Sequence, residues 1–184
     1  MNIALFGGSF DPPHIGHEKI VHKALDTLDI GKLVVVPAFL NPFKIKSHFS
    51  PKDRLELIKD LFDDEKKVKI SNFEVEQNKA TPSIETVKYL KEKYNPKIIY
   101  LIIGADNIKS LHLWQDFDKL NQLVTFVTIS RYGYEEKNDI IQFINIKLDI
   151  NISSTTLRED LDLKYIPKKI EQKVKQLWKK ELKE

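Results

Sequence analysis

Cysteine is absent from the 184 residues of the chain, which excludes disulfides, thiolate nucleophiles and cysteine-ligated zinc or iron–sulfur sites. The N-terminus also lacks the basic region, apolar stretch and cleavage site that mark a signal peptide. No apolar run reaches the roughly 18 residues that a membrane-spanning helix requires. We therefore expect a cytoplasmic protein with no membrane partner.

An excess of charge of one sign is lacking as well. The formal net charge is +3 although 31% of the residues are charged, so the composition predicts no nucleic-acid partner. The lysines of the C-terminal segment alternate with glutamates opposite an apolar stripe, which is typical of a solvated helix face. Arginine is scarce, since Arg54, Arg131 and Arg158 are the only three. We expect so rare a residue where a planar guanidinium fork is needed.

What the sequence does contain is an alternation of strands and helices. Apolar runs predict buried parallel strands at residues 2–6, 32–37, 68–73, 98–103, 123–130 and 143–148. Apolar residues at helical spacing predict helices at residues 20–28, 51–62 and 83–94, and a C-terminal helical segment from about residue 154. This alternation predicts a doubly wound, Rossmann-like α/β fold with a mostly parallel sheet, in one domain that covers residues 1–184. Ligands of such folds bind beyond the carboxyl ends of the strands.

The stretch GGSFDPPHIGH follows the first expected strand and holds three of the six glycines. Gly7 and Gly8 permit positive φ and let backbone amides approach a phosphate at the mouth of a helix. His14 and His17 are three residues apart in the opening turn, so both imidazoles can face one ligand. Two alternatives stay open: the histidines are solvated, or they bind a metal, although no third ligand stands at a recognisable spacing.

The stretch NISSTTLRE, residues 151–159, predicts a helix capped by Ser153 or Ser154. Arg158 then lies one turn into the helix, where the positive end of the dipole disfavours a cation. An anionic ligand would remove that conflict, because amides, hydroxyls and guanidinium could together bind the β- and γ-phosphates of ATP. A capped helix start without a ligand is the alternative.

A third candidate region follows the strand expected at residues 98–103. Gly104 and Asp106 come directly after that strand, where a carboxylate can accept hydrogen bonds from ribose hydroxyls. Trp114 follows in a polar stretch, where its indole either packs in the core or stacks on an aromatic ligand. The composition and spacing leave both readings of Trp114 open.

These residues carry a family resemblance over nearly the whole chain. GGSFDPPHIGH resembles the HxGH signature of the nucleotidyltransferase superfamily, and in its fuller form it is similar to the bacterial nicotinate mononucleotide adenylyltransferases. ISSTTLR resembles their ISSTxIR signature, IIGAD with Trp114 resembles their IIGxD followed by tryptophan, and RYG matches their R-x-G element. The resemblance implies transfer of the adenylyl group of ATP to nicotinate mononucleotide in NAD biosynthesis. Mg²⁺ would enter with ATP and no metal site of the protein is expected, because the sequence shows no dedicated carboxylate cage.

The resemblance also assigns residues. It implies that His14 and His17 are catalytic. It implies an ATP site formed by Gly7, Gly8, Ser9, Phe10, Lys44, Gly104, Asp106, Ile152, Ser153, Ser154 and Arg158. It implies a mononucleotide site formed by Ser83, Asp106, Trp114 and Arg131.

Two departures from the family pattern leave the substrate less defined. Phe43 stands before Lys44 where the family has histidine, and Pro82 and Ser83 replace a tyrosine and a threonine. Whether the acid or the amide mononucleotide is preferred therefore stays open. The alternatives are an adenylyltransferase for nicotinamide mononucleotide or phosphopantetheine, a non-catalytic nucleotide sensor, and a class I aminoacyl-tRNA synthetase fragment, which would need a KMSKS-type loop. A homo-oligomer is also left open.

Overall fold

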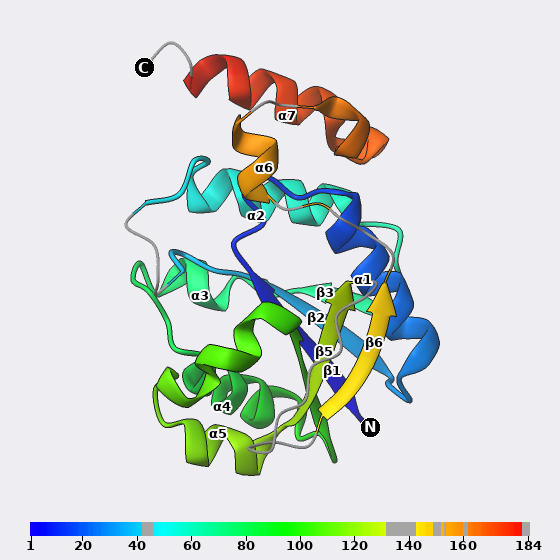
Figure 1. The fold of residues 1–184 in the computed structure, drawn as a ribbon, viewed down its shortest axis with the longest axis vertical. Coiled ribbons are helices and arrows are strands. Elements are labelled where there is room, and N and C mark those ends of the chain that lie inside the picture. The colour runs from blue at the N-terminus through cyan, green and yellow to red at the C-terminus, as the bar shows by residue number, and fades with distance from the viewer. Residues whose placement is uncertain (42–45, 132–142, 149–151, 153, 160–161, 182–184) are drawn as a thin grey trace.

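The structure, a computed structural model, describes residues 1–41, 46–131, 143–148, 152, 154–159 and 162–181 (Figure 1). Its centre is a sheet of six strands, namely β1 (Ile3–Gly8), β2 (Lys32–Pro37), β3 (Val68–Ile70), β4 (Ile99–Gly104), β5 (Thr125–Arg131) and β6 (Phe143–Leu148). The strand order is β3-β2-β1-β4-β5-β6, and all five neighbouring pairs are parallel. The order reverses between β1 and β4, so the carboxyl ends of these strands are where a doubly wound sheet binds ligands. The predicted fold class is confirmed.

The helices lie on both faces of this sheet. They are α1 (Ile15–Thr27), α2 (Pro51–Leu61), α3 (Phe73–Glu76), α4 (Ser83–Tyr94), α5 (Phe117–Leu123), α6 (Ser154–Glu159) and α7 (Lys168–Glu181), with two 3₁₀ helices, η1 (Ala105–Leu113) and η2 (Leu163–Tyr165). Ser50 caps α2, because its Oγ accepts a hydrogen bond from the Asp53 amide at 3.1 Å, and Pro51 opens that helix. Asn95, with φ 42°, ends α4 in the left-handed conformation.

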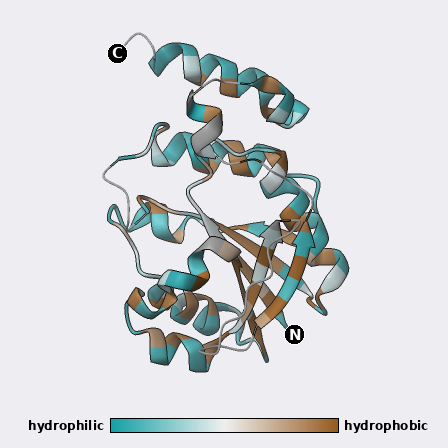
Figure 2. Cartoon of the chain, viewed as in Figure 1, coloured by the Kyte–Doolittle hydropathy of each residue, from teal (hydrophilic) through white to brown (hydrophobic). Residues whose placement is uncertain are grey.

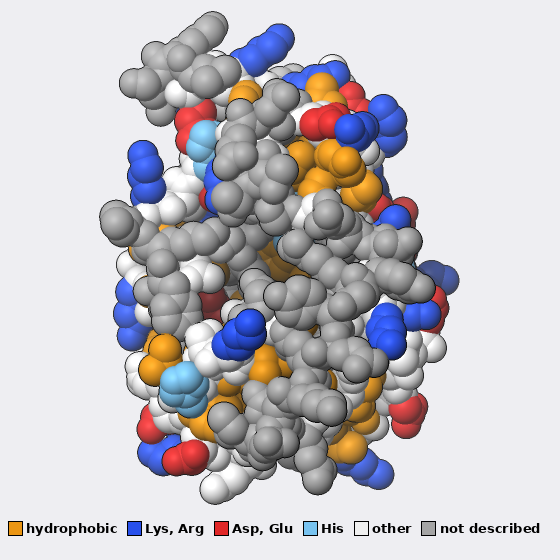
Figure 3. Space-filling view, in the orientation of Figure 1, with side chains coloured by type: hydrophobic (Ala, Val, Ile, Leu, Met, Phe, Trp, Pro, Cys, Tyr) orange, Lys and Arg blue, Asp and Glu red, His pale blue; other side chains and the backbone are white. Residues whose placement is uncertain are grey.

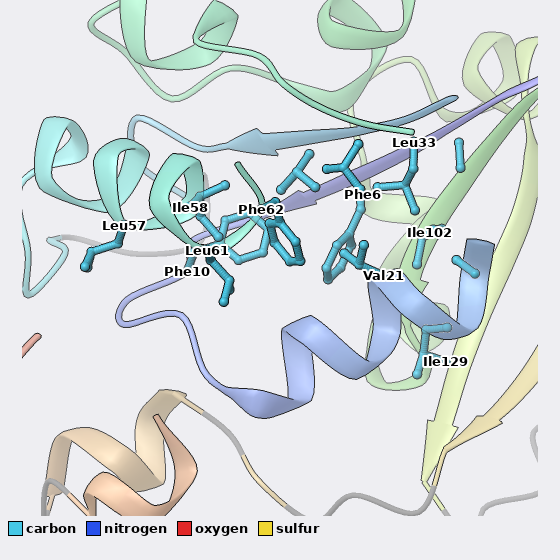
Figure 4. Close-up of a cluster of buried hydrophobic side chains, with 14 of the residues drawn as sticks. Phe6, Phe10, Val21, Leu33, Leu57, Ile58, Leu61, Phe62, Ile102 and Ile129 are labelled. Atoms are coloured by element: carbon cyan, nitrogen blue, oxygen red, sulfur yellow. The ribbon is translucent and has the colours of Figure 1, made fainter. Parts of the chain in front are cut away.

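Successive residues of the central strands point to opposite faces and build two hydrophobic cores. Ala4 and Phe6 face the first core, which contains residues from α1, α2 and α7. Ile3 and Leu5 face the second core, which contains residues from α4, η1 and α5. Figure 4 shows part of the first core, with Phe6 directed toward side chains of α1 and α2. Figure 2 shows apolar residues on the strands and polar residues on the outer sides of the helices.

The C-terminal helix α7 packs on α2 through Ile170 and Val174, both buried. Lys173 Nζ lies 2.8 Å from Asp60 Oδ2, and Lys169 pairs with Asp63 and Asp64 of the turn after α2. Some lysines that were expected only on a solvated face therefore form ion pairs with α2 and the turn after it. Figure 3 shows acidic and basic side chains interspersed on the face in view. None of the described helices combines the length and the hydropathy of a membrane span.

The strand predicted at residues 68–73 was wrong at its end. β3 stops at Ile70, and Phe73 begins α3 instead. The Phe73 amide donates a hydrogen bond to Ser71 Oγ at 3.3 Å, which turns the chain away from the sheet. The Phe73 ring then stacks on Tyr89 of α4, with centroids 4.1 Å apart. Its apolar side chain thus packs against a helix rather than within a strand.

Candidate functional site

The loop after β1 depends on Gly8 and Phe10, because the absence of a side chain at Gly8 leaves space for the Phe10 ring. A Cβ on Gly8 would lie 3.0 Å from Phe10 Cζ, so glycine makes room for the aromatic ring. Phe10 is 1% exposed, has φ 49° and meets Phe6 edge-on at 5.4 Å. Neither Gly7 nor Gly8 has a φ between +20° and +160°, so the freedom that glycine gives the backbone there is not used for a left-handed conformation. Burial of the ring offsets the strain of the left-handed conformation at Phe10.

The start of α1 is capped by its own imidazoles. His14 is the N-cap residue, and its Nδ1 accepts a hydrogen bond from the Gly16 amide at 3.1 Å. The His14 amide in turn donates to His17 Nδ1 at 3.2 Å, and the two rings stack with centroids 3.7 Å apart. An Nδ1 that accepts a hydrogen bond carries no proton, so each neutral ring has its proton on Nε2. The cap therefore sets the tautomer and orientation of both rings.

The glycine between the two histidines is required by their packing. A Cβ on Gly16 would lie 2.8 Å from Cε1 and Nδ1 of His14 and 3.2 Å from Ile152 Cγ2. Burial, and next the neighbouring His14, hold the pKa of His17 well below its usual value. His17 is therefore neutral at pH 7, and because its Nδ1 accepts from the His14 amide, its one ring proton is on Nε2.

Two segments that are distant in the sequence, residues 11–12 and 154–158, meet beside this imidazole pair. Ser154 Oγ donates to the Pro12 carbonyl at 3.2 Å, and Arg158 Nη1 donates to the Asp11 carbonyl at 2.8 Å. The expected conflict between Arg158 and the helix dipole was wrong, because α6 has six residues and Arg158 lies in its last turn. A cation is favoured at that end of a helix.

Two residues that were assigned no role in the predicted site hold the surrounding loops. The buried Asp11 carboxylate accepts hydrogen bonds from the amides of His48 and Phe49, both at 2.8 Å. Arg54 is 1% exposed and donates to four backbone carbonyls at 2.6–3.1 Å, those of Ser9, Ala38, Phe39 and Phe49. The rare guanidinium fork is used here on carbonyls, and it joins the loops after β1 and β2.

A cavity of about 390 Å³ lies at the carboxyl ends of β1 and β4. Five residues of the predicted site line it: Gly7, Gly8, Ser83, Gly104 and Trp114. Residues that the sequence did not indicate also line it, among them Glu74, Thr81 and Asn107, whose Nδ2 donates to the Gly104 carbonyl at 3.2 Å. These five predicted residues are thus brought to one edge of the sheet.

Trp114 belongs both to the core and to the cavity. Its ring packs against the second core, and it also lines the cavity. Its Nε1 is buried and has no hydrogen-bond partner among the described residues. A buried indole N–H without a partner is costly, and a ligand acceptor would satisfy it. The two readings left open by the sequence are therefore compatible.

The start of α4 faces the same cavity. Its N-cap is Pro82, no side chain caps it, and Ser83 is its first residue. Free amides and the helix dipole make such a start favourable for an anion.

A buried acid lies beneath the start of α4. Thr86 Oγ1 donates a hydrogen bond to Glu74 Oε1 at 2.6 Å. Burial raises the pKa of Glu74 to about 7, and the hydrogen bond from Thr86 opposes that rise.

Some predicted site residues cannot be placed in this arrangement. Lys44 and Ser153 lie outside the described residues. Asp106 lies in η1 and Arg131 ends β5, so their backbones are at the carboxyl edge of the sheet, but their side chains are outside the description. Within the described residues, no group of three or more histidine or acidic side chains is arranged to hold a metal ion.

Comparison with known proteins gives concordant matches. The cytidylyltransferase-like family matches residues 5–160. A protein of Aliarcobacter butzleri named "Probable nicotinate-nucleotide adenylyltransferase" is 45% identical over 174 residues, 95% of this chain and 95% of that protein. A Campylobacter fetus protein of the same name is 47% identical over 179 residues, 97% of each. The solved structure of Plasmodium falciparum nicotinic acid mononucleotide adenylyltransferase complexed with NaAD matches with TM-score 0.74 and 26% identity, over 95% of each chain.

Proposed function

The chain belongs to the nicotinate-nucleotide adenylyltransferase family, and from this premise we propose that it transfers the adenylyl group of ATP to nicotinate mononucleotide. The products are nicotinate adenine dinucleotide and pyrophosphate. The observation that carries the proposal is the stacked pair of His14 and His17, fixed at the start of α1 in the segment that follows β1, whose Gly7 and Gly8 line the cavity at the switch point of the sheet. The complex of the Plasmodium falciparum enzyme with NaAD supports the same product.

The reaction we propose is a direct in-line displacement. A phosphate oxygen of the mononucleotide attacks the α-phosphorus of ATP, a new P–O bond forms, and the bond to the bridging oxygen of pyrophosphate breaks. The protein contributes charge stabilisation and positioning. The Nε2–H groups of His14 and His17 donate to oxygens of the transferring phosphoryl group. Because the Nδ1 hydrogen bonds already hold both rings, these donors need no reorganisation as charge develops.

We propose that the nucleotide lies along the loop after β1. Gly7, Gly8, Ser9 and Phe10 form that loop, and Gly104 ends β4 opposite it. Ile152, Ser154 and Arg158, with Ser153 and Lys44, would bind the leaving pyrophosphate. Contacts of Ser154 and Arg158 with the carbonyls of Pro12 and Asp11 support this assignment, because they keep α6 against the imidazole loop.

Mg²⁺ would enter as part of MgATP, with phosphate oxygens among its ligands. The ion is therefore part of the substrate, and none of the described residues is proposed as its ligand. The chemistry uses ATP, a nucleotide of the cell interior, and we accordingly propose a cytoplasmic location.

The mononucleotide is assigned to the cavity. We propose that the pyridine ring stacks on Trp114 and that its carboxylate faces the uncapped start of α4 at Ser83. Asp106 and Arg131 would bind the ribose and phosphate of the nucleotides. The dimensions support this, because a cavity of about 390 Å³ is within the usual range for a small-molecule site.

Pyrophosphate release tests the proposal directly. The purified protein is incubated with MgATP and one of three acceptors: nicotinate mononucleotide, nicotinamide mononucleotide or phosphopantetheine. We expect release with the pyridine mononucleotides and no release with phosphopantetheine. Release with phosphopantetheine alone would assign the chain to a related adenylyltransferase, and release with none of the three would indicate a non-catalytic nucleotide-binding protein.

A further inference from the structure

The cavity contains a buried acid to which the proposed chemistry gives no role. Glu74 is the only ionisable side chain among the described residues that line the cavity. It comes from α3, the short helix after β3, and is 8% exposed. A carboxyl group is rarely buried unless it is paired, so its position calls for a physical account.

Glu74 is held beneath the first turn of α4. Its Oε1 accepts a hydrogen bond at 2.6 Å from Thr86 Oγ1, and Thr86 is 1% exposed. Pro82 and Ser83, at the start of the same helix, line the cavity together with Glu74. The acid therefore lies at the helix start that we assign to the carboxylate of the substrate.

Charged groups on the elements around Glu74 are engaged elsewhere. On α2, the guanidinium of Arg54 binds backbone carbonyls. On α4, Glu85 pairs with Lys79 at 3.8 Å on an exposed side, and Lys88 is exposed.

The charged groups of α3 and β2 also have other partners. On α3, Glu76 accepts a hydrogen bond from Asn72 Nδ2 at 2.5 Å. On β2, Lys32 lies over the Tyr94 ring at 4.4 Å. None of these side chains forms an ion pair with Glu74 in the described structure.

We propose that the proton on Glu74 selects the pyridine mononucleotide: the neutral carboxyl admits the acid form, and the ionised carboxyl favours the amide form. This inference rests on the proposed function. Two carboxylates in one poorly solvated cavity repel each other, and an ionised Glu74 would compete with nicotinate for the dipole of α4. A carboxamide carries no charge, and its NH₂ group is a donor that an ionised carboxylate accepts.

The selection depends on pH near neutrality. Burial raises the pKa of Glu74 to about 7. Below pH 7 the carboxyl is mostly neutral, and both mononucleotides can enter. Above pH 7, binding of the acid requires the protonated minority, whose fraction falls about tenfold for each further pH unit. The ratio of kcat/KM for the acid to kcat/KM for the amide should therefore fall with rising pH.

The kinetic test measures that ratio from pH 6 to pH 8.5 at saturating MgATP. In the wild type we expect it to be nearly constant below pH 7 and to fall up to about tenfold per unit above it. Glu74→Gln should keep the ratio constant, because glutamine remains neutral and can still accept from Thr86. Glu76→Gln on the same helix is the matched control and should follow the wild type. Titration of the histidines and substrate phosphates affects both substrates and cancels in the ratio.

A second measurement needs no variant. Calorimetric binding of each mononucleotide at pH 7 to the wild type with a non-cleavable ATP analogue, in HEPES and in Tris, gives the protons taken up. We expect binding of nicotinate mononucleotide to be accompanied by the uptake of more protons than binding of nicotinamide mononucleotide, with a difference of up to about half a proton. Equal uptake, or a ratio of kcat/KM that does not change with pH, would overturn the role of Glu74 and leave the proposed function intact. Adenylyl transfer to neither mononucleotide would instead overturn the proposed function.

Discussion

The start of α1 and the start of α4 lie at the same edge of the sheet, but their backbone amides have different partners. At α1, the imidazoles of His14 and His17 accept the amide hydrogen bonds and stack on each other. At α4, no side chain caps the helix, and Ser83 faces the cavity. An anion at α1 meets oriented side-chain donors, whereas an anion at α4 meets the amides themselves. The first arrangement suits charge that develops during a reaction, and the second suits a charge that the bound substrate already carries.

Replacing His17 by alanine removes one of the two imidazoles at the start of α1 and should have the largest effect on turnover. The variant loses one donor to the transferring phosphoryl group, and His14 loses the partner of its amide. We expect kcat to fall by about 10²-fold to 10³-fold, with a loss of about 1 kcal/mol in the free energy of unfolding. Steady-state kinetics and denaturant unfolding measure the two quantities.

His22→Ala is the matched control for that variant. His22 lies on the same helix, is exposed, and pairs with Glu65 at 3.0 Å. We expect its kcat to stay within about twofold of the wild type, since exposed ion pairs contribute little. Near-normal turnover of His17→Ala would remove the imidazole pair from the chemistry.

The buried acid beneath α4 makes the second prediction, which concerns stability. The pKa of Glu74 is raised in the folded protein from 4.5 to about 7, so between these values the folded state binds more protons than the unfolded state. The free energy of unfolding should therefore fall as pH rises through this window, by up to ~3 kcal/mol from this group. Glu74→Gln should lack that fall and be more stable than the wild type at pH 8. Denaturant unfolding at pH 5 and pH 8 measures it, and an equal difference between the proteins at both pH values would contradict the raised pKa.

Gly16→Ala tests whether turnover depends on the orientation of the His14 and His17 imidazoles as well as on their presence. The new Cβ would lie 2.8 Å from the His14 ring, which is held by stacking and must shift. We expect kcat to fall about 10-fold to 10²-fold, because small misplacements of catalytic groups are costly. Gly31→Ala is the control, since its Cβ would meet only the flexible and exposed Met1 side chain. Equal turnover of the two variants would show that the ring geometry is not critical.

Much of the fold was predictable because its signals are local. β1, β2 and β4 are buried on both faces, so they appear in the sequence as unbroken apolar runs. The imidazole pair was also predictable, since a spacing of three residues at a helix start brings two rings together. The end of β3 was not, because Phe73 gains its partner, Tyr89, from a helix that starts ten residues later.

The residues that were assigned no role from the sequence act through distant contacts. Asp11 binds amides 37 and 38 residues away, and Glu74 meets Thr86 across a loop between two helices. No local pattern marks such partners. Arg54 did leave a signal, because it shares the buried helical stripe of Leu57, Ile58 and Leu61. A charged residue in a core-facing position indicates a buried partner, which here is a set of backbone carbonyls.

Trp114→Ala tests whether the indole contacts the mononucleotide near the start of α4, and it has the smallest expected effect. If the pyridine ring stacks on the indole, removing it should raise KM for the mononucleotide about 5-fold to 10-fold and KM for ATP by less than about twofold. Trp178→Ala is the control, because this second tryptophan packs on His48, with centroids 4.5 Å apart, and is not among the described residues that line the cavity. Its KM values should both stay near the wild type. Equal increases in the two KM values of Trp114→Ala would mean that the indole supports the second core without contacting the ligand, and the carboxylate at α4 would then lack its aromatic neighbour.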